Sequence, residues 1–218
     1  MKALLALSLA VGVAAPVAAQ ARRPAQKETN ALSIRGVGFF SSEQLAAKKT
    51  FDAIFGESSE RLFGGGVVVA ERGLFFEVDF SRFSKTGQRA FLSNGQAFRL
   101  NIPLTATVTP VEVTGGYRFR FRRRPTIVPY AGAGFGSYGY KETSSFSDPG
   151  EEIDVRHVGY LVAGGVEFRL HRWVGVAGDV QYTHVPGILG TAGLSKDAGE
   201  SDLGGTAVRV KVLVGTGR

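Results

Sequence analysis

The sequence predicts an all-β fold, an eight-stranded antiparallel up-and-down transmembrane β-barrel. Three observations predict it. Apolar and polar residues alternate with a period of two along most of the chain, short connections alternate with long ones, and the first twenty residues have the composition of an export signal. The 218 residues include 30 glycines and no cysteine, which excludes thiolate metal sites and thiol nucleophiles.

Residues 1–20 predict a secretory signal peptide. A lysine follows the initial methionine, an apolar run occupies residues 3–15, and small residues come next. The run is shorter than the roughly 20 apolar residues that a membrane-spanning helix needs. We expect cleavage after one of three residues, Ala19, Gln20 or Ala21.

The rest of the chain predicts a flexible leader and one domain. Residues 21–31 are polar and contain a proline, which suits a leader, and we assign residues 32–218 to a single barrel domain. No later segment has 18 consecutive apolar residues, so we expect no helix of the mature chain to span a bilayer.

Eight segments show the alternation of a strand with one apolar and one polar face. In the clearest, four valines at even positions from 208 to 214 alternate with Arg209 and Lys211. We expect a helical turn within residues 43–55. The strands are expected at about residues 32–40, 63–70, 74–81, 111–121, 127–140, 158–170, 174–183 and 208–214.

The connections sort into two kinds that alternate along the chain. Tight turns are expected at residues 71–73, 122–125 and 171–172, and long loops at 41–62, 84–97, 142–154 and 185–202. Brief periplasmic turns and longer outer loops are typical of transmembrane barrels. We therefore expect both termini on the periplasmic side and four long loops outside.

The polar faces of the strands carry as many acids as bases. In a narrow closed barrel these side chains would face the interior and pair with one another. An eight-stranded barrel is just wide enough to be filled by side chains, so we expect no diffusion pore. The predicted lumen charge network consists of Glu77, Asp79, Glu112, Arg118, Arg120, Glu167, Arg169, Asp179, Arg209 and Lys211.

The segment VEVTGGYRFRFRRRP, residues 111–125, illustrates the two faces. Arg118 and Arg120 are predicted to point into the lumen, towards acids such as Glu77 or Glu167, and residues 122–124 to form a basic turn. The apolar partners Val113, Tyr117, Phe119 and Phe121 are expected to meet lipid. Aromatic belts near strand ends are expected from Tyr117, Phe119, Phe121, Tyr130, Tyr138, Tyr140, Phe168, Trp173 and Tyr182.

Segments 129–140, PYAGAGFGSYGY, and 159–185, GYLVAGGVEFRLHRWVGVAGDVQYTHV, resemble strands of small bacterial outer-membrane barrels of the OmpA-like and opacity-type class. The resemblance covers roughly residues 32–215. It implies residence in the outer membrane, contact with its lipid, insertion by the barrel-assembly machinery, a monomer, and a structural, adhesion or surface-binding role through the long loops. The ending VLVGTGR departs from the aromatic last residue usual in this class.

Two alternatives remain open, a lipid-modifying outer-membrane acyl hydrolase or acyltransferase and a soluble lipocalin-like binding barrel. An acyl hydrolase needs a histidine beside a serine nucleophile. Only His157, His171 and His184 are present, and none lies in a His-x-Ser arrangement. We therefore expect no catalytic residue and no enzyme activity.

We expect no cofactor, no metal and no nucleic acid partner. The acids Asp148, Glu151, Glu152 and Asp154 suit a solvated loop better than a calcium site. The sequence pI of about 9.9 raises the question of nucleic acid, but an exported chain does not normally meet it, and the arginines alternate with apolar residues.

Overall fold

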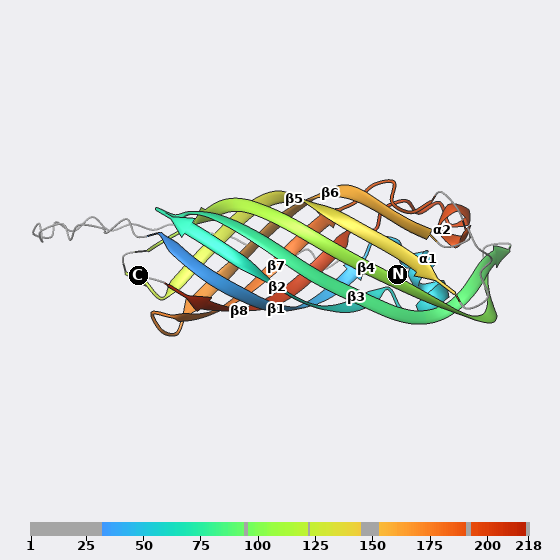
Figure 1. Ribbon diagram of the computed structural model, residues 1–218, viewed down its shortest axis with the longest axis horizontal. Coiled ribbons are helices and arrows are strands. Elements are labelled where there is room, and N and C mark those ends of the chain that lie inside the picture. Colours follow the sequence, from blue (N-terminus) through green and yellow to red (C-terminus); the bar gives the residue numbers. More distant parts are fainter. Residues whose placement is uncertain (1–31, 94–95, 122, 145–152, 191–192, 217–218) are drawn as a thin grey trace, which may run out of the picture.

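The computed structural model describes residues 32–93, 96–121, 123–144, 153–190, 193–216. Eight antiparallel strands pair in chain order, and the first pairs with the last, so the sheet closes into a barrel (Figure 1). This confirms the predicted fold class. The strands are β1 (Ser33–Leu45), β2 (Ser59–Glu71), β3 (Leu74–Ser93), β4 (Gln96–Arg118), β5 (Ile127–Thr143), β6 (Ile153–Arg169), β7 (Val174–His184) and β8 (Gly205–Gly215).

The two ends of the barrel differ, as the connection lengths predicted. One end carries the short connections β2–β3, β4–β5 and β6–β7 together with the end of β8. The other end carries helices α1 (Lys48–Phe55) and α2 (Gly193–Asp197) (Figure 1). Helix α1 lies within the segment expected to hold a helical turn, whereas α2 was not expected. Among the described residues no helix is long and apolar enough to cross a membrane.

The expected long loop at residues 84–97 is wrong, because this segment is part of a hairpin. Strands β3 and β4 stay paired from Ser84 and Thr107 to Ser93 and Gln96, with one irregularity near Gln88. Figure 1 shows the hairpin extending beyond the neighbouring strands at the end that holds the helices. The segment lacks an apolar face, but an antiparallel ladder satisfies the backbone without one. The hydrophobic periodicity therefore did not indicate a strand in this segment.

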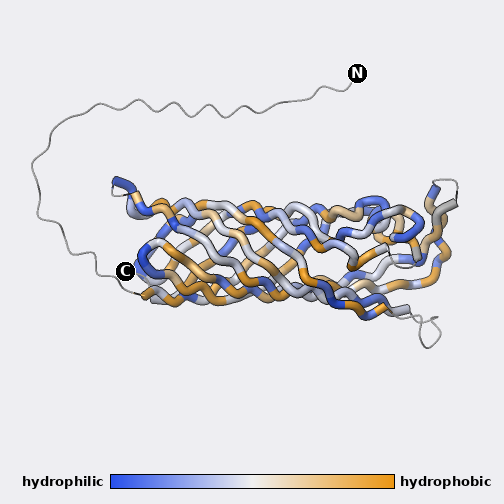
Figure 2. Tube along the Cα trace, turned by 90° about the horizontal axis from the view of Figure 1, so that it is seen from above, coloured by the Kyte–Doolittle hydropathy of each residue, from blue (hydrophilic) through white to orange (hydrophobic). Residues whose placement is uncertain are grey.

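The outer surface of the barrel is apolar, and its interior holds buried charged side chains as well as apolar clusters. Hydrophobic residues gather along the middle of the tube and hydrophilic ones towards its ends (Figure 2). This is the reverse of a soluble lipocalin-like barrel, whose apolar faces point inward. Outward-facing exposed residues include Phe76, Val78, Phe80, Val158, Tyr160, Val162, Val180, Tyr182, Val208, Val210, Val212 and Val214.

Three residues expected in aromatic belts lie inside the barrel instead. Tyr138 and Tyr140 are buried, and the hydroxyl of Tyr130 donates to Asp179 in the lumen. Strand β5 alternates tyrosine with small residues, so its inward and outward faces cannot be told apart by hydropathy. The exposed aromatic residues from that prediction are Tyr117, Phe119, Phe121, Phe168, Trp173 and Tyr182.

Candidate functional site

Charged side chains inside the barrel form two groups at different depths. The first, the central network, consists of Glu77, Asp79, Glu112, Asp179, Arg209 and Lys211. The second, the mouth cluster, consists of Arg35, Arg118, Glu167 and Arg169, near the end with the short turns. An apolar layer lies between them, formed by Val68, Phe75, Ala177 and Leu213.

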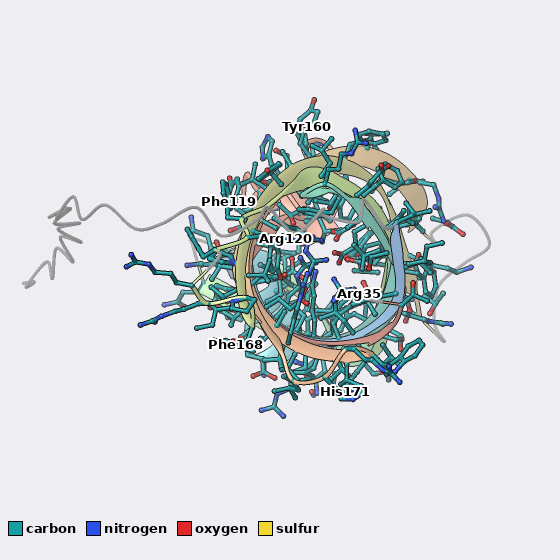
Figure 3. The ribbon with its side chains drawn as sticks, turned by 90° about the vertical axis from the view of Figure 1, so that its left-hand side faces the viewer. Arg35, Phe119, Arg120, Tyr160, Phe168 and His171 are labelled. Carbon is teal, nitrogen blue, oxygen red and sulfur yellow. The ribbon has the colours of Figure 1, made fainter. Side chains whose placement is uncertain are left out.

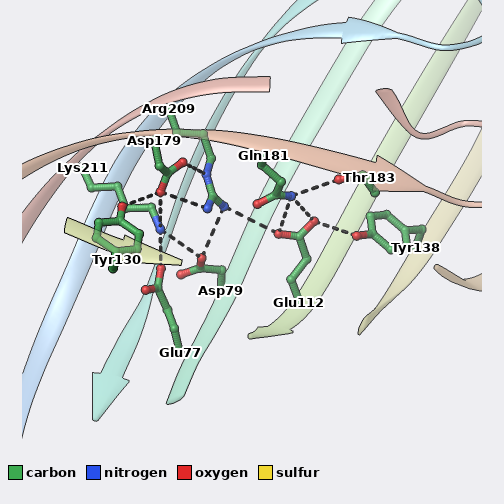
Figure 4. A network of polar contacts seen from close by, with 10 residues as sticks. All are labelled: Glu77, Asp79, Glu112, Tyr130, Tyr138, Asp179, Gln181, Thr183, Arg209 and Lys211. Atoms are coloured by element: carbon green, nitrogen blue, oxygen red, sulfur yellow. Dashed lines mark hydrogen bonds and ion pairs between the residues drawn. The ribbon is translucent and has the colours of Figure 1, made fainter. Parts of the chain in front are cut away.

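Asp179 is the centre of the first group. Its carboxylate accepts two hydrogen bonds from Arg209, at 2.6 Å from Nε and 3.1 Å from Nη2, and lies 3.1 Å from Nζ of Lys211. Lys211 also lies 2.6 Å from Glu77, and Nη1 of Arg209 lies 3.7 Å from Asp79 (Figure 4). Both cations are thereby shared between strands β3, β7 and β8, which ties together parts of the wall that are not adjacent.

Neutral polar groups extend the central network towards the helices. Glu112 accepts hydrogen bonds from Tyr138 at 2.7 Å and from Gln181 at 3.0 and 3.1 Å (Figure 4). The Gln181 amide also donates to Thr183 at 3.0 Å. Glu112 is therefore held mainly by neutral donors, while Nη1 of Arg209 remains 3.8 Å away.

Glycines opposite the two aspartates make room for them. Gly66 pairs with Asp79 and Gly165 pairs with Asp179 in the sheet register. A Cβ at Gly66 would approach the Asp79 carboxylate to 2.3 Å, and one at Gly165 would approach Cβ of Asp179 to 2.4 Å. Both glycines thus serve the network, a role that the glycine-rich sequence did not reveal.

The mouth cluster gathers three arginines around one carboxylate. Arg35 binds Glu167 with two hydrogen bonds, at 2.7 Å and 3.1 Å, and Nε of Arg169 lies 3.3 Å away. Arg118 forms an ion pair with the same carboxylate. Arg35, Arg118 and Glu167 are buried, whereas Arg169 is partly exposed. Strands β1, β4 and β6 are linked here across the lumen.

Nine of the ten predicted network residues take part in these ion pairs, and Arg120 is the exception. Arg120 follows the last residue of β4 and is exposed. Figure 3 shows it within the ring of strands at the barrel mouth, together with Arg35, while Phe119, Phe168 and Tyr160 point outward. Alternation gave the correct side for Arg120, but the strand ends before it can be buried.

Sequence reasoning missed Arg35, Tyr130, Tyr138 and Gln181. Arg35 lies on the face of β1 that also carries Val37 and Phe39. In the sequence this face therefore looked apolar, and Arg35 was not assigned to the lumen. Gln181 and the tyrosines are uncharged and gave no charge pattern.

The half of the lumen nearest the helices contains a cluster of buried apolar side chains, and the acids Glu43 and Glu60 line a cavity beside it. Phe51 of α1 is fully buried among residues such as Leu62, Phe83, Tyr140 and Val185. The carboxylate of Glu200 accepts hydrogen bonds from the backbone nitrogens of Lys49 and Thr50 at the start of α1, which holds this helix over the barrel. Interior cavities of about 40 Å³ and 10 Å³ remain.

The histidines lie at the ends of the barrel. Nδ1 of His184 is 2.7 Å from Asp202, whose other oxygen accepts from the backbone of Val185 and Gly204. His157 is half-buried and His171 lies in the β6–β7 turn. The acids Asp148, Glu151 and Glu152 fall outside the described residues, and Asp154 pairs with Lys141 at 3.6 Å.

A family model for the outer membrane protein beta-barrel domain matches residues 3–213. The chain belongs to this family. Membership of the outer membrane protein beta-barrel family places the protein in the bacterial outer membrane and confirms the resemblance to eight-stranded barrels of this class. In outer-membrane barrels in general, the apolar exterior faces lipid and the end with short turns faces the periplasm.

Solved structures with a similar fold include Neisserial surface protein A, at 13% identity and a TM-score of 0.49. The N-terminal β-barrel domain of Pseudomonas aeruginosa OprF is similar at 10% identity and a TM-score of 0.48. Ail, the attachment invasion locus protein of Yersinia pestis, is similar at 14% identity and a TM-score of 0.48. Each alignment covers 84% of this chain and 96% of the other. No curated protein sequence matches the chain.

Proposed function

We propose that the protein is a closed outer-membrane barrel that acts through its outer end, in a structural, adhesion or surface-interaction role. The filled interior carries this proposal. A water needs roughly 10–15 Å³ of such cavity space, so the two interior cavities of about 40 and 10 Å³ formed by the described residues each hold at most a few waters. The buried charges are engaged with one another and do not line a channel.

The outer end offers a surface suited to contact with a partner. The β3–β4 hairpin presents Phe91 and Phe98, whose rings stack at 5.3 Å, and both are exposed, as is Leu100. Arg99 of the same hairpin donates to the backbone oxygen of Ala53 in α1, at 3.0 Å. This contact anchors the hairpin to the helix, so the exposed side chains of Phe91, Phe98 and Leu100 are presented on a supported element.

The partners follow from this placement. Outer-membrane lipid surrounds the apolar wall, the barrel-assembly machinery inserts the chain after export with a cleaved signal peptide, and a surface ligand binds the outer end. One barrel closes its own sheet edges, so we propose a monomer.

Two measurements test the proposal. Purified protein in planar bilayers should show no steady conductance, and stepwise openings would overturn the closed lumen. Replacing Phe91, Phe98 and Leu100 with serine should reduce binding of whole cells to host or neighbouring cell surfaces while heat-modifiable gel migration stays unchanged. If the triple variant leaves surface binding and envelope integrity intact, the interaction role of the hairpin is wrong.

The His184–Asp202 pair is the observation that favours the enzyme alternative. A histidine held by a carboxylate is two-thirds of an acyl-transfer triad. Here, however, Asp202 also holds two backbone nitrogens, and the His184 ring stacks on Tyr160 at 6.4 Å, which suits a structural contact at the rim. We propose no enzyme activity. His184→Ala and His157→Ala should leave lipid A and phospholipid acyl content unchanged, and altered acylation would favour the enzyme.

A further inference from the structure

The mouth cluster holds more buried donors than its carboxylate can accept. Both oxygens of Glu167 already contact two guanidinium groups each. This uses about the full capacity of a carboxylate, which has roughly four lone-pair sites. In the part of the chain that the structure describes, the Nε atoms of Arg35 and Arg118 are buried without a hydrogen-bond partner. A buried charged donor that lacks an acceptor is unfavourable.

The positive charge at the mouth also exceeds the negative charge. Arg35, Arg118 and Arg169 share the carboxylate of Glu167. Arg120 lies near enough to repel Arg118 and Arg169, while Glu77 of the central network attracts Arg35 and Arg118 from further inside. The preceding segment, residues 22–30, contains three basic residues and one acid, so it brings no excess of negative charge. Among the described residues the mouth cluster therefore carries more positive than negative charge.

A pocket of about 340 Å³ opens beside these arginines at the periplasmic end. It lies between the start of β1, the β4–β5 turn and the β6–β7 turn. Its polar lining comes from Ser33, Arg35, Thr126, Arg169, His171 and Arg172. Two of the arginines that share Glu167 thus also face a space that is open to the periplasm.

We propose that this pocket binds a phosphate group, with Arg35 and Arg169 as its main ligands. A phosphate offers three or more acceptor oxygens in a compact group, and guanidinium groups bind it with paired, charge-assisted hydrogen bonds. The same chemistry is available from a phospholipid headgroup of the inner leaflet or from free phosphate in the periplasm. Leu170 and Trp173, both exposed beside the pocket, place it at the level where headgroups lie.

The test uses the full mature chain, refolded in phosphate-free maltoside micelles. Inorganic phosphate is titrated and followed by phosphorus NMR line width, and the binding is expected to saturate. Arg169→Gln should weaken binding at least about tenfold, the loss expected for one charge-assisted hydrogen bond. Arg169 is partly exposed, so this variant should fold. Arg169→Lys keeps the charge without the paired donors and should give an intermediate loss.

The matched control is Arg72→Gln, which removes an exposed arginine from the β2–β3 turn at the same end of the barrel. It should weaken binding less than about twofold, because it changes only long-range attraction. Equal losses for Arg72→Gln and Arg169→Gln would overturn the site, and so would binding that does not saturate.

A second titration separates the two sources of phosphate. Dihexanoyl-phosphatidylglycerol is added in place of inorganic phosphate, and each is then used to displace the other. Tighter binding of the lipid, lost in Arg169→Gln, assigns the site to a headgroup. If inorganic phosphate displaces the lipid but the lipid does not displace inorganic phosphate, the site is assigned to free phosphate. If Arg169→Gln changes neither titration, the proposal fails.

Discussion

The central network and the mouth cluster are built from the same residue types, but their charge balance is opposite. In the central network four carboxylates surround Arg209 and Lys211, whereas in the mouth cluster three arginines surround Glu167. Within these two groups the two excesses cancel. The difference teaches that equal numbers of inward-facing acids and bases can still be separated along the barrel axis.

The two excesses have different consequences. A carboxylate can bind a proton and become a neutral donor, whereas arginine stays charged in proteins. Protonation can therefore reduce the repulsion among surplus acids, whereas the repulsion among surplus arginines persists. We expect the mouth cluster to depend strongly on its one acid, and the central network to tolerate the loss of one of its four.

The largest effect is expected from Glu167→Gln. This change leaves three guanidinium groups without an anion, two of them buried, and removing one partner of a buried ion pair costs about 3–5 kcal/mol. Urea unfolding in detergent micelles, followed by the gel mobility shift, should show a correspondingly lower free energy of unfolding. The control Asp154→Asn removes an exposed acid and should change it by less than about 0.5 kcal/mol.

A smaller loss is expected from Asp179→Asn, although Asp179 has more partners in its network. Lys211 retains Glu77 at 2.6 Å, and Asp79 and Glu112 lie within 3.8 Å of Arg209. We expect a loss of about 1–3 kcal/mol, measured by the same unfolding curves. A loss larger than that of Glu167→Gln would show that local charge excess does not decide the cost.

Tyr138→Phe tests the neutral extension of the central network. It removes one hydrogen bond to Glu112, which keeps the two contacts from Gln181. The unfolding free energy should fall by about 1 kcal/mol. Glu112→Gln in the same background should then cost little more, because the neutral amide still accepts from Gln181. A large additional loss would mean that Arg209, at 3.8 Å, contributes more than its distance indicates.

The smallest effect is expected from Arg169→Gln. The substitution removes a contact of 3.3 Å to Glu167 but also relieves repulsion within the mouth cluster. These contributions oppose each other, so stability should change by less than about 1 kcal/mol in either direction. Thermal or urea unfolding measured without phosphate checks this, since a bound anion would stabilise the unsubstituted protein alone.

Much of the fold followed from the sequence, because period two and connection length are local properties. The alternation of valines with Arg209 and Lys211 fixed the two faces of β8, and the order of short and long connections fixed which end carries the turns. The extent of β3 and β4 could not be predicted. Residues 84–93 and 96–107 pair through backbone hydrogen bonds, which leave no mark on hydropathy.

The candidate site shows the same division. By itself the sequence determined which charged residues point inward, because strand parity sets the face of each side chain. Only the tertiary structure decided their depth and partners. The register of the closed sheet brings Arg35 of β1 against Glu167 of β6, residues 132 positions apart that no local pattern connects. Strand tilt and register are properties of the closed barrel, and they separate a balanced set of charges into an acidic centre and a basic mouth.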